Sequence, residues 1–384
     1  MFHVFLPWFE QSTALGAQST AVLPSHAEIL TYSNPAMTAL GLINLLGAWG
    51  NHVFFMISGF FLIPSLAASS RRFGYWRSQI VPTSRRCAVV VISVLLYGCL
   101  ALMINAWIMP LPGAGSRSWW GMGLEFVWLY LCFVALAPII GWVVERMGSG
   151  KAEFLIIALI CVVYGLNAYI AFVSQGEVMG RGLGDWRKLM SAVSYLLSFT
   201  VAGLIGKRIR DTSVGGIEPK TLQWWRRPKL LMTGACLVGA VAWLLSVLTT
   251  LHGRYDLLYA LSFKSTSLIS FVLALLALLF CSSLQLSVRF AAKARARMVL
   301  TLAPGILGFY IAQSLMHAVW FIPCFSMMSR ILGHVAGNAR LTPVATVLVF
   351  FTFGVIFAVL FAAVLCGIDR VLRRPILRML RLAK

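Results

Sequence analysis

The stretch that decides the fold reads Gly50-Asn51-His52-Val53-Phe54-Phe55-Met56-Ile57-Ser58-Gly59-Phe60-Phe61-Leu62-Ile63. It lies inside an apolar segment, roughly residues 38–68, without Asp, Glu, Lys or Arg. A segment of that length can cross a bilayer as a helix. Asn51 and His52 nevertheless place polar groups at membrane depth, where they need partners. Two interpretations stay open: these residues line a cavity, or Gly50, Ser58 and Gly59 are the small contacts of a tight helix pair.

Composition places the chain in the membrane. Of its 384 residues, 60% are hydrophobic and 11% are charged, whereas soluble domains carry about 25% charged residues. The longest polar stretches, about 25 residues, are too short for an independent core. We therefore predict an all-α, polytopic transmembrane helix bundle forming a single domain over residues 1–384. The eight cysteines include no Cys-x-x-Cys pair and most fall in apolar segments, so we expect buried hydrophobes and no metal site.

Nine apolar runs are long enough to be full spans. They cover roughly residues 38–68, 87–109, 119–143, 153–174, 190–206, 230–250, 263–284, 298–323 and 343–368. Residues 1–9 are also apolar and are interpreted as the second half of a further helix whose first half is absent. The sequence therefore predicts nine full spans plus a partial first helix.

The positive charge is unevenly distributed among the loops. Of the 32 Lys and Arg residues, alternate loops place 24 on one side and 8 on the other, with none between residues 10 and 36. Such an excess marks the cytoplasmic face. We therefore expect a multi-pass protein of the plasma or inner membrane with a cytoplasmic C-terminus. The net charge of +21 is assigned to this asymmetry and not to nucleic-acid binding. Basic loops suit anionic lipid headgroups or a polyanionic cytosolic donor.

Ionisable residues in apolar segments are the main candidates for function. His3 suits a general base, because imidazole titrates near working pH; an interfacial His beside Trp8 is the alternative. Glu125 is placed about a quarter of the way into its span and needs a partner. Gln313 and His317 are four residues apart and would share one helix face. The residues expected to line a cavity are Asn51, His52, Ser58, Glu125, Gln313 and His317.

Several segments, in order, carry a resemblance to one family. Residues 50–63 are similar to a Phe-Phe-x-x-Ser-Gly-Phe-Leu helix, and residues 126–138 to a Trp-Tyr-Leu-Tyr helix that ends in Pro. Residues 194–207 resemble a Tyr-x-x-Phe-x-x-x-Gly segment, and residues 305–313 a Thr-x-Gly-Ile-Tyr-Leu-x-His motif. Residues 1–4 match the end of a first helix with a catalytic His. Together they resemble the acyltransferase-3 family of bacterial integral membrane acyltransferases, which commonly O-acetylate surface polysaccharides and have ten spans.

The resemblance implies an O-acyltransferase. The donor would be acetyl-CoA or another acyl-CoA from the cytosol, and the acceptor a hydroxyl of a surface glycan or lipid-linked sugar. His3 would be catalytic, and polysaccharide assembly proteins are possible partners alongside membrane lipid. Arginines at the second loop would hold the donor's phosphates: Arg71, Arg72, Arg77, Arg85 and Arg86.

Departures from the family pattern keep two other functions open. Gln313 stands where the family has its late His, and the family's Arg-x-x-Arg in the second loop is not intact. The first helix is cut just before His3, which indicates a late start or an inactive member. The alternatives are a transporter or flippase for a lipid-linked glycan, and an inactive scaffold of a polysaccharide assembly complex. ATP-driven transport is disfavoured, because the sequence has no Walker-type loop.

Overall fold

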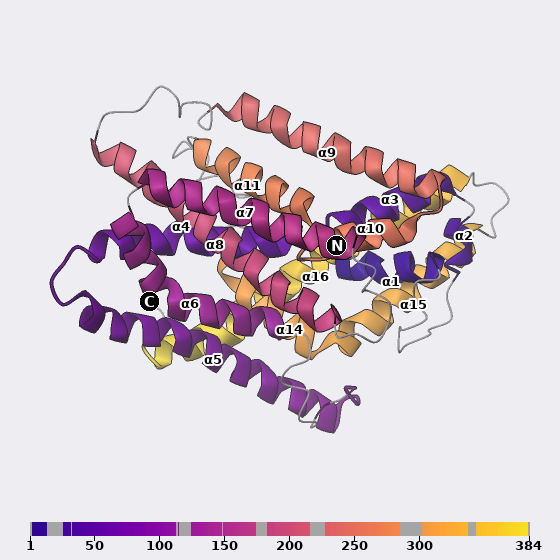
Figure 1. Ribbon diagram of the computed structural model, residues 1–384. Coiled ribbons are helices and arrows are strands. Elements are labelled where there is room, and N and C mark those ends of the chain that lie inside the picture. The colour runs from indigo at the N-terminus through magenta and orange to yellow at the C-terminus, as the bar shows by residue number, and fades with distance from the viewer. Residues whose placement is uncertain are drawn as a thin grey trace.

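The computed structural model describes residues 2–13, 26–31, 33–112, 114, 124–147, 149–173, 183–215, 227–284, 302–336 and 343–382. These residues form helices and connecting turns, without strands, arranged as one elongated bundle (Figure 1). The predicted all-α, polytopic bundle is thereby confirmed. In order, the elements are α1 (Phe2–Ser12), α2 (Glu28–Thr31), α3 (Asn34–Leu45), α4 (Trp49–Ser69), α5 (Tyr75–Trp107), α6 (Glu125–Met147), α7 (Ser149–Phe172), α8 (Leu183–Gly215), α9 (Pro228–Leu251), α10 (Tyr255–Ser262), α11 (Leu268–Ser283), the short 3-10 helix η4 (Ala303–Gly305), α14 (Ile306–Leu315), α15 (His317–Ala336) and α16 (Pro343–Met379).

Eight helices of the described residues are long and apolar enough to cross a membrane, with α3 and α4 counted together as one segment of 36 residues. The run predicted over 263–284 is α11, which has only 16 residues. The run predicted over 298–323 needs correction. Its described part is divided at Met316, and α15 continues to Ala336 through residues that had been assigned to a loop.

Helix α4 lies at the centre of the bundle and packs against α8, α6 and α11. Its contact with α8 is so close that a Cβ on Gly59 would overlap the Phe199 carbonyl. On the other side of the contact, a Cβ on Gly203 would overlap Ile63, and one on Gly206 would overlap the Phe60 carbonyl. Small residues thus let the two backbones approach, as in other membrane helix pairs. The tight-pair interpretation is right for Gly59, whereas Gly50 is exposed.

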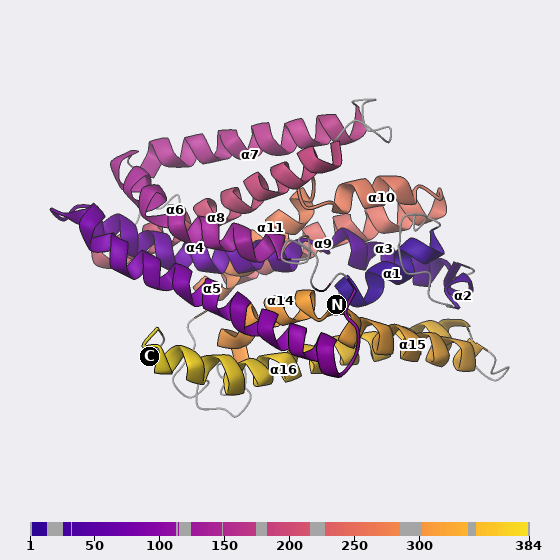
Figure 2. The ribbon, with the colours of Figure 1, turned by 90° about the horizontal axis from the view of Figure 1, so that it is seen from below.

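The two ends of the bundle differ. Figure 2 shows α1, α2, α3, α10 and α15 gathered at one end and the C-terminus at the other. Contacts of α3 with α1, α2 and α10 agree with this view. At the C-terminal end, Arg85 donates to the carbonyls of Arg381 and Leu382. We call these the α3 end and the C-terminal end. The charge count assigned the more basic loops to the cytoplasmic face, and the described parts of those loops belong to the C-terminal end.

Candidate functional site

Helix α1 is fixed at the α3 end by large aromatic residues. Phe5, Trp8 and Phe9 are fully buried, and Trp8 stacks on Phe325 of α15 with ring centroids 4.6 Å apart. Close packing of these rings holds the short helix against α3, α15 and α16. His3 lies on the same helix and remains accessible.

His3 is within electrostatic range of two groups from distant parts of the chain, His317 and Lys264. His317 is the first residue of α15, and Lys264 lies in the turn between α10 and α11. All three side chains are accessible. We call His3, His317 and Lys264 the histidine cluster. It combines two imidazole side chains with one cation.

Two further charged residues lie within electrostatic range of Lys264. Surrounding protein lowers the pKa of Lys264, an effect that Glu125 opposes and Lys188 reinforces. Glu125 and Lys188 form an ion pair at 3.7 Å, and both are more than half exposed. Glu125 is the first residue of α6, so its predicted position inside the span is wrong. It is an end-of-helix carboxylate beside the cluster, stabilised there by the helix dipole.

Asn51 and His52 of α4 form hydrogen bonds with side chains of α8. His52 is fully buried, and its Nδ1 lies 2.7 Å from Ser198 Oγ. Because Ser198 donates to the Ser194 carbonyl at 3.0 Å, its oxygen is left to accept the Nδ1 proton of His52. Asn51 donates to the Tyr195 hydroxyl at 3.0 Å. His52 therefore anchors α4 to α8 and does not line an accessible space as predicted.

Ser58 lies deeper in the bundle, between the histidine cluster and the C-terminal end. Its hydroxyl donates to the Phe54 carbonyl at 3.0 Å and interacts with the hydroxyl of Tyr130. Arg86 of α5 is within electrostatic range of Tyr130. One predicted cavity residue and one predicted donor-binding arginine thus meet at the same tyrosine.

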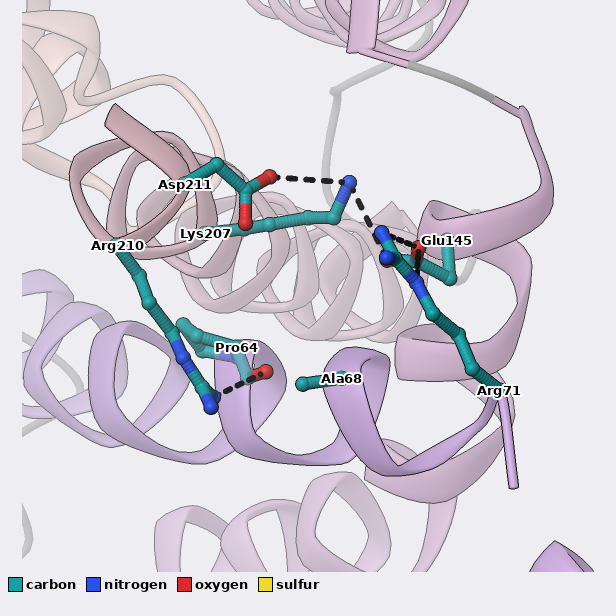
Figure 3. A pocket seen from close by; sticks show the side chains of 7 residues that line it. All are labelled: Pro64, Ala68, Arg71, Glu145, Lys207, Arg210 and Asp211. Atoms are coloured by element: carbon teal, nitrogen blue, oxygen red, sulfur yellow. Dashed lines mark hydrogen bonds and ion pairs between the residues drawn. The ribbon is translucent and has the colours of Figure 1, made fainter. Parts of the chain in front are cut away.

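A charged pocket of about 180 Å³ lies at the C-terminal end, between α4, α6 and α8 (Figure 3). Glu145 is at its centre and pairs with Arg71 and, at 3.3 Å, with Lys207. Lys207 also reaches Asp211 at 3.6 Å, and Arg210 donates to the Pro64 carbonyl at 3.1 Å. The pocket thus contains three cations and two carboxylates, and two of the cations pair with Glu145.

The five predicted donor-binding arginines are divided among different places. Arg71 lies in the charged pocket, Arg85 donates to the C-terminal backbone, and Arg86 lies within electrostatic range of Tyr130. Arg72 and Arg77 are exposed near the start of α5. The structure therefore brings Arg71 together with Lys207 and Arg210, which had not been assigned this role.

Gln313 and His317 do not share one helix face. Helix α14 ends at Leu315, α15 begins at His317, and the Trp320 indole donates to the Gln313 carbonyl at 3.0 Å across the break. Gln313 is half-buried, whereas His317 is accessible. His317 is the residue of this pair that lies within electrostatic range of His3.

Sequence reasoning missed a buried ion pair between Asp369 and Arg373 on α16. The predicted span stopped at residue 368, and the arginine was assigned to the C-terminal tail. An acid and a base four residues apart share a helix face, so continuing the helical pattern past residue 368 would have found the pair.

Comparison with known proteins gives a family. A family model described as an acyltransferase domain, that of acyltransferase-3, matches residues 2–366. No curated protein and no solved structure matches the chain. The match extends over nearly the whole chain, from α1 through most of α16, and so includes both the histidine cluster and the charged pocket. The chain is therefore a multi-pass membrane protein that belongs to the acyltransferase-3 family.

Proposed function

We propose that this protein transfers an acyl group, in the first instance acetyl, from a cytosolic acyl-CoA to a hydroxyl of a surface glycan or lipid-linked sugar. The observation that carries the proposal is the histidine cluster: His317 and Lys264, from two distant parts of the sequence, lie within electrostatic range of His3. Acyl transfer to a hydroxyl needs a base for its proton and a positive charge for the carbonyl oxygen. The cluster offers both.

The proposed reaction assigns each group a step. His3 accepts the proton of the acceptor hydroxyl while the hydroxyl oxygen attacks the thioester carbonyl. A carbon–oxygen bond forms, the carbon–sulfur bond breaks, and the proton returns to the departing CoA thiolate. Lys264 stabilises the negative charge that develops on the carbonyl oxygen. His317 orients His3 and provides a second site for the proton.

The charged pocket is the proposed site for the donor's phosphates. Arg71, Lys207 and Arg210 supply three cations there. From Ala68 beside the pocket to Trp49 at the other end of the helix, α4 rises about 28 Å at 1.5 Å per residue. Ser58 lies on α4 between these two residues, and Tyr130 interacts with Ser58 and lies within electrostatic range of Arg86. The extended arm of the donor would follow this route. In this proposal the C-terminal end faces the cytoplasm and the histidine cluster lies toward the outer face.

The test is acetate on purified surface polysaccharide from a deletion strain. The strain is complemented with wild type, His3→Ala, His317→Ala or the matched control His252→Ala. His252 is exposed at the end of α9, where its ring bonds the Leu248 carbonyl. We expect wild type and the control to restore acetate and the two cluster variants to fail. Unchanged acetate in the deletion strain would instead favour the transporter or scaffold function for that glycan.

The side from which the donor enters is tested separately. Inverted membrane vesicles that contain the protein are given radiolabelled acetyl-CoA and compared with right-side-out vesicles. Labelling of lipid-linked sugar is expected only in inverted vesicles, since CoA does not cross the bilayer. Equal labelling of right-side-out vesicles would contradict a cytoplasmic charged pocket.

A further inference from the structure

We propose that the buried Asp369–Arg373 pair of α16 is a positioning pair. It fixes helix α14 and thereby sets the position of Tyr310, which lies beside Gly50 of α4, and of His317 in the histidine cluster. This inference rests on the proposed function, because it takes His317 as part of the reacting cluster. Neither residue touches the cluster, so the role is positioning and not catalysis.

The pair is completely enclosed. Asp369 has no exposed side-chain surface, and Arg373 has 6%. Arg373 Nε lies 2.5 Å from Asp369 Oδ1, and Nη2 lies 2.9 Å from Oδ2, so the two side chains meet as a fork. The Tyr97 hydroxyl of α5 donates to Asp369 Oδ1 at 2.9 Å. Geometry of this kind is both strong and directional.

The remaining donors of Arg373 reach two other elements. Nη1 donates to Ser93 Oγ of α5 at 3.3 Å, and Nη2 donates to the Pro304 carbonyl at 3.2 Å. Pro304 belongs to η4, which leads directly into α14. One guanidinium therefore joins α16 and α5 to the first turn before α14.

Helix α14 lies directly on the pair. A Cβ on Gly308 would overlap the Asp369 carboxylate and come within 2.8 Å of the Tyr97 hydroxyl. A Cβ on Gly305 would come within 2.9 Å of the Cys366 carbonyl. Because these two glycines leave no room for a side chain, the path of α14 follows the position of the ion pair closely.

The position of α14 matters to the site because the helix is short and interrupted at both ends. It has ten residues between η4 and the break at Met316, so no continuous helix fixes its orientation. The Tyr310 hydroxyl lies 3.8 Å from where a Cβ on Gly50 would be, at the start of α4. His317 follows immediately after the break. A shift of α14 therefore moves Tyr310 and His317 together.

Stability alone does not explain a charged pair at this place. A buried ion pair is often no more stabilising than well-packed apolar residues of similar volume, because desolvation offsets the attraction. What the pair adds over an apolar contact is a set of directional bonds to Tyr97, Ser93 and Pro304. Such bonds specify one position for η4 and α14, which a smooth apolar surface would not.

The test uses the full-length protein in nanodiscs with three variants. Asp369→Asn leaves Arg373 buried without its carboxylate. The double variant Asp369→Asn/Arg373→Met removes both charges, so that no unpaired charge stays buried. It serves as the test if the single variant fails to fold. Gly367→Ala is the matched control, because a Cβ there meets nothing within 4 Å. Hydrogen–deuterium exchange of residues 306–315 and acyl-transfer kinetics are measured for each.

We expect exchange of residues 306–315 to rise at least tenfold in the double variant, with α4 and α8 unchanged and the control equal to wild type. The kcat should fall about 100-fold with the donor KM unchanged, since a displacement of about 1 Å in a site can cost that much. Unchanged exchange of α14, or a uniform rise throughout the bundle, would overturn the positioning role. If wild type transfers no acyl group, the proposed function fails, and the exchange measurement still decides the role of the pair.

Discussion

The contact between α4 and α8 makes a sharp prediction about Gly59. In Gly59→Ala the new Cβ would overlap the Phe199 carbonyl oxygen and lie 2.7 Å from the Phe199 carbonyl carbon. These are backbone atoms, so no side-chain rotation can relieve the overlap. Moving the carbonyl carbon alone to an ordinary contact of 3.4 Å requires the helices to separate by about 0.7 Å at this point, and the closer carbonyl oxygen requires more.

The cost follows from that separation. Inserting a methyl group into a packed contact destabilises by roughly 1–3 kcal/mol, and a gap of 0.5–1 Å forfeits about a quarter to a half of each neighbouring dispersion contact. The exchange of Gly for Ala gains up to about 1 kcal/mol of helix propensity. The net expectation is a loss of about 1–2 kcal/mol, measured as a lower apparent Tm of the purified protein in one detergent.

Gly165→Ala supplies the matched control. Gly165 is exposed on α7, and a Cβ there meets nothing within 4 Å. This variant has the same gain in propensity without the overlap, so its Tm should equal or exceed that of wild type. A Gly59→Ala protein as stable as Gly165→Ala would refute the argument that α4 and α8 are in backbone contact at this point.

Three further predictions concern charges. Arg71→Gln should raise the KM for the acyl donor about tenfold, equivalent to roughly 1.4 kcal/mol, with little change in kcat. The control Arg77→Gln, at an exposed arginine, should leave both constants unchanged. Steady-state kinetics measures KM and kcat for each variant. Lys264→Met should move the acidic limb of the pH–rate profile to higher pH, because a neighbouring positive charge opposes protonation of His3; an identical profile would remove Lys264 from this role. Arg254→Ala should leave the apparent Tm unchanged in a thermal scan, because its pairing with a nearby aspartate is exposed.

The bundle could be predicted because the bilayer imposes a simple requirement on the sequence. Long runs without charge must become helices that satisfy their own backbone, and the segments that became α5, α7 and α9 needed no further information. The sharing of one end by Arg71, Lys207 and Arg85 followed from charge asymmetry alone. Such features depend on composition over many residues and are insensitive to the exact contacts.

The site could be predicted only in part, because its geometry depends on tertiary contacts. His3 and His317 were singled out as ionisable residues in apolar surroundings, but nothing local placed them beside Lys264. His52 was indistinguishable from a cavity residue until Ser198 was seen to hold it. Asp369 escaped notice because a hydropathy window ends where charges begin, whereas the helix continues as long as the charges find partners.

The interruptions in two helices connect the fold to the site. Helix α3 ends at Leu45 and α14 ends at Leu315, and each break frees carbonyls that lipid could not satisfy. In both cases a side chain from another helix supplies the bond: Ser270 donates to the Leu45 carbonyl at 3.3 Å, and Trp320 donates to the Gln313 carbonyl at 3.0 Å. The breaks are thus specifically stabilised.

The two helix breaks lie next to residues of the candidate site. The Tyr310 hydroxyl and Gly50, which lie close together, belong to the two interrupted helices, and His317 begins the segment after the second break. Irregular backbone within a membrane is tolerated where protein or a polar space surrounds it. A continuous helix through residues 306–336 would rotate His317 away from its present position relative to Gln313. The break therefore allows α14 to pack on the Asp369–Arg373 pair while His317, at the start of α15, lies within electrostatic range of His3.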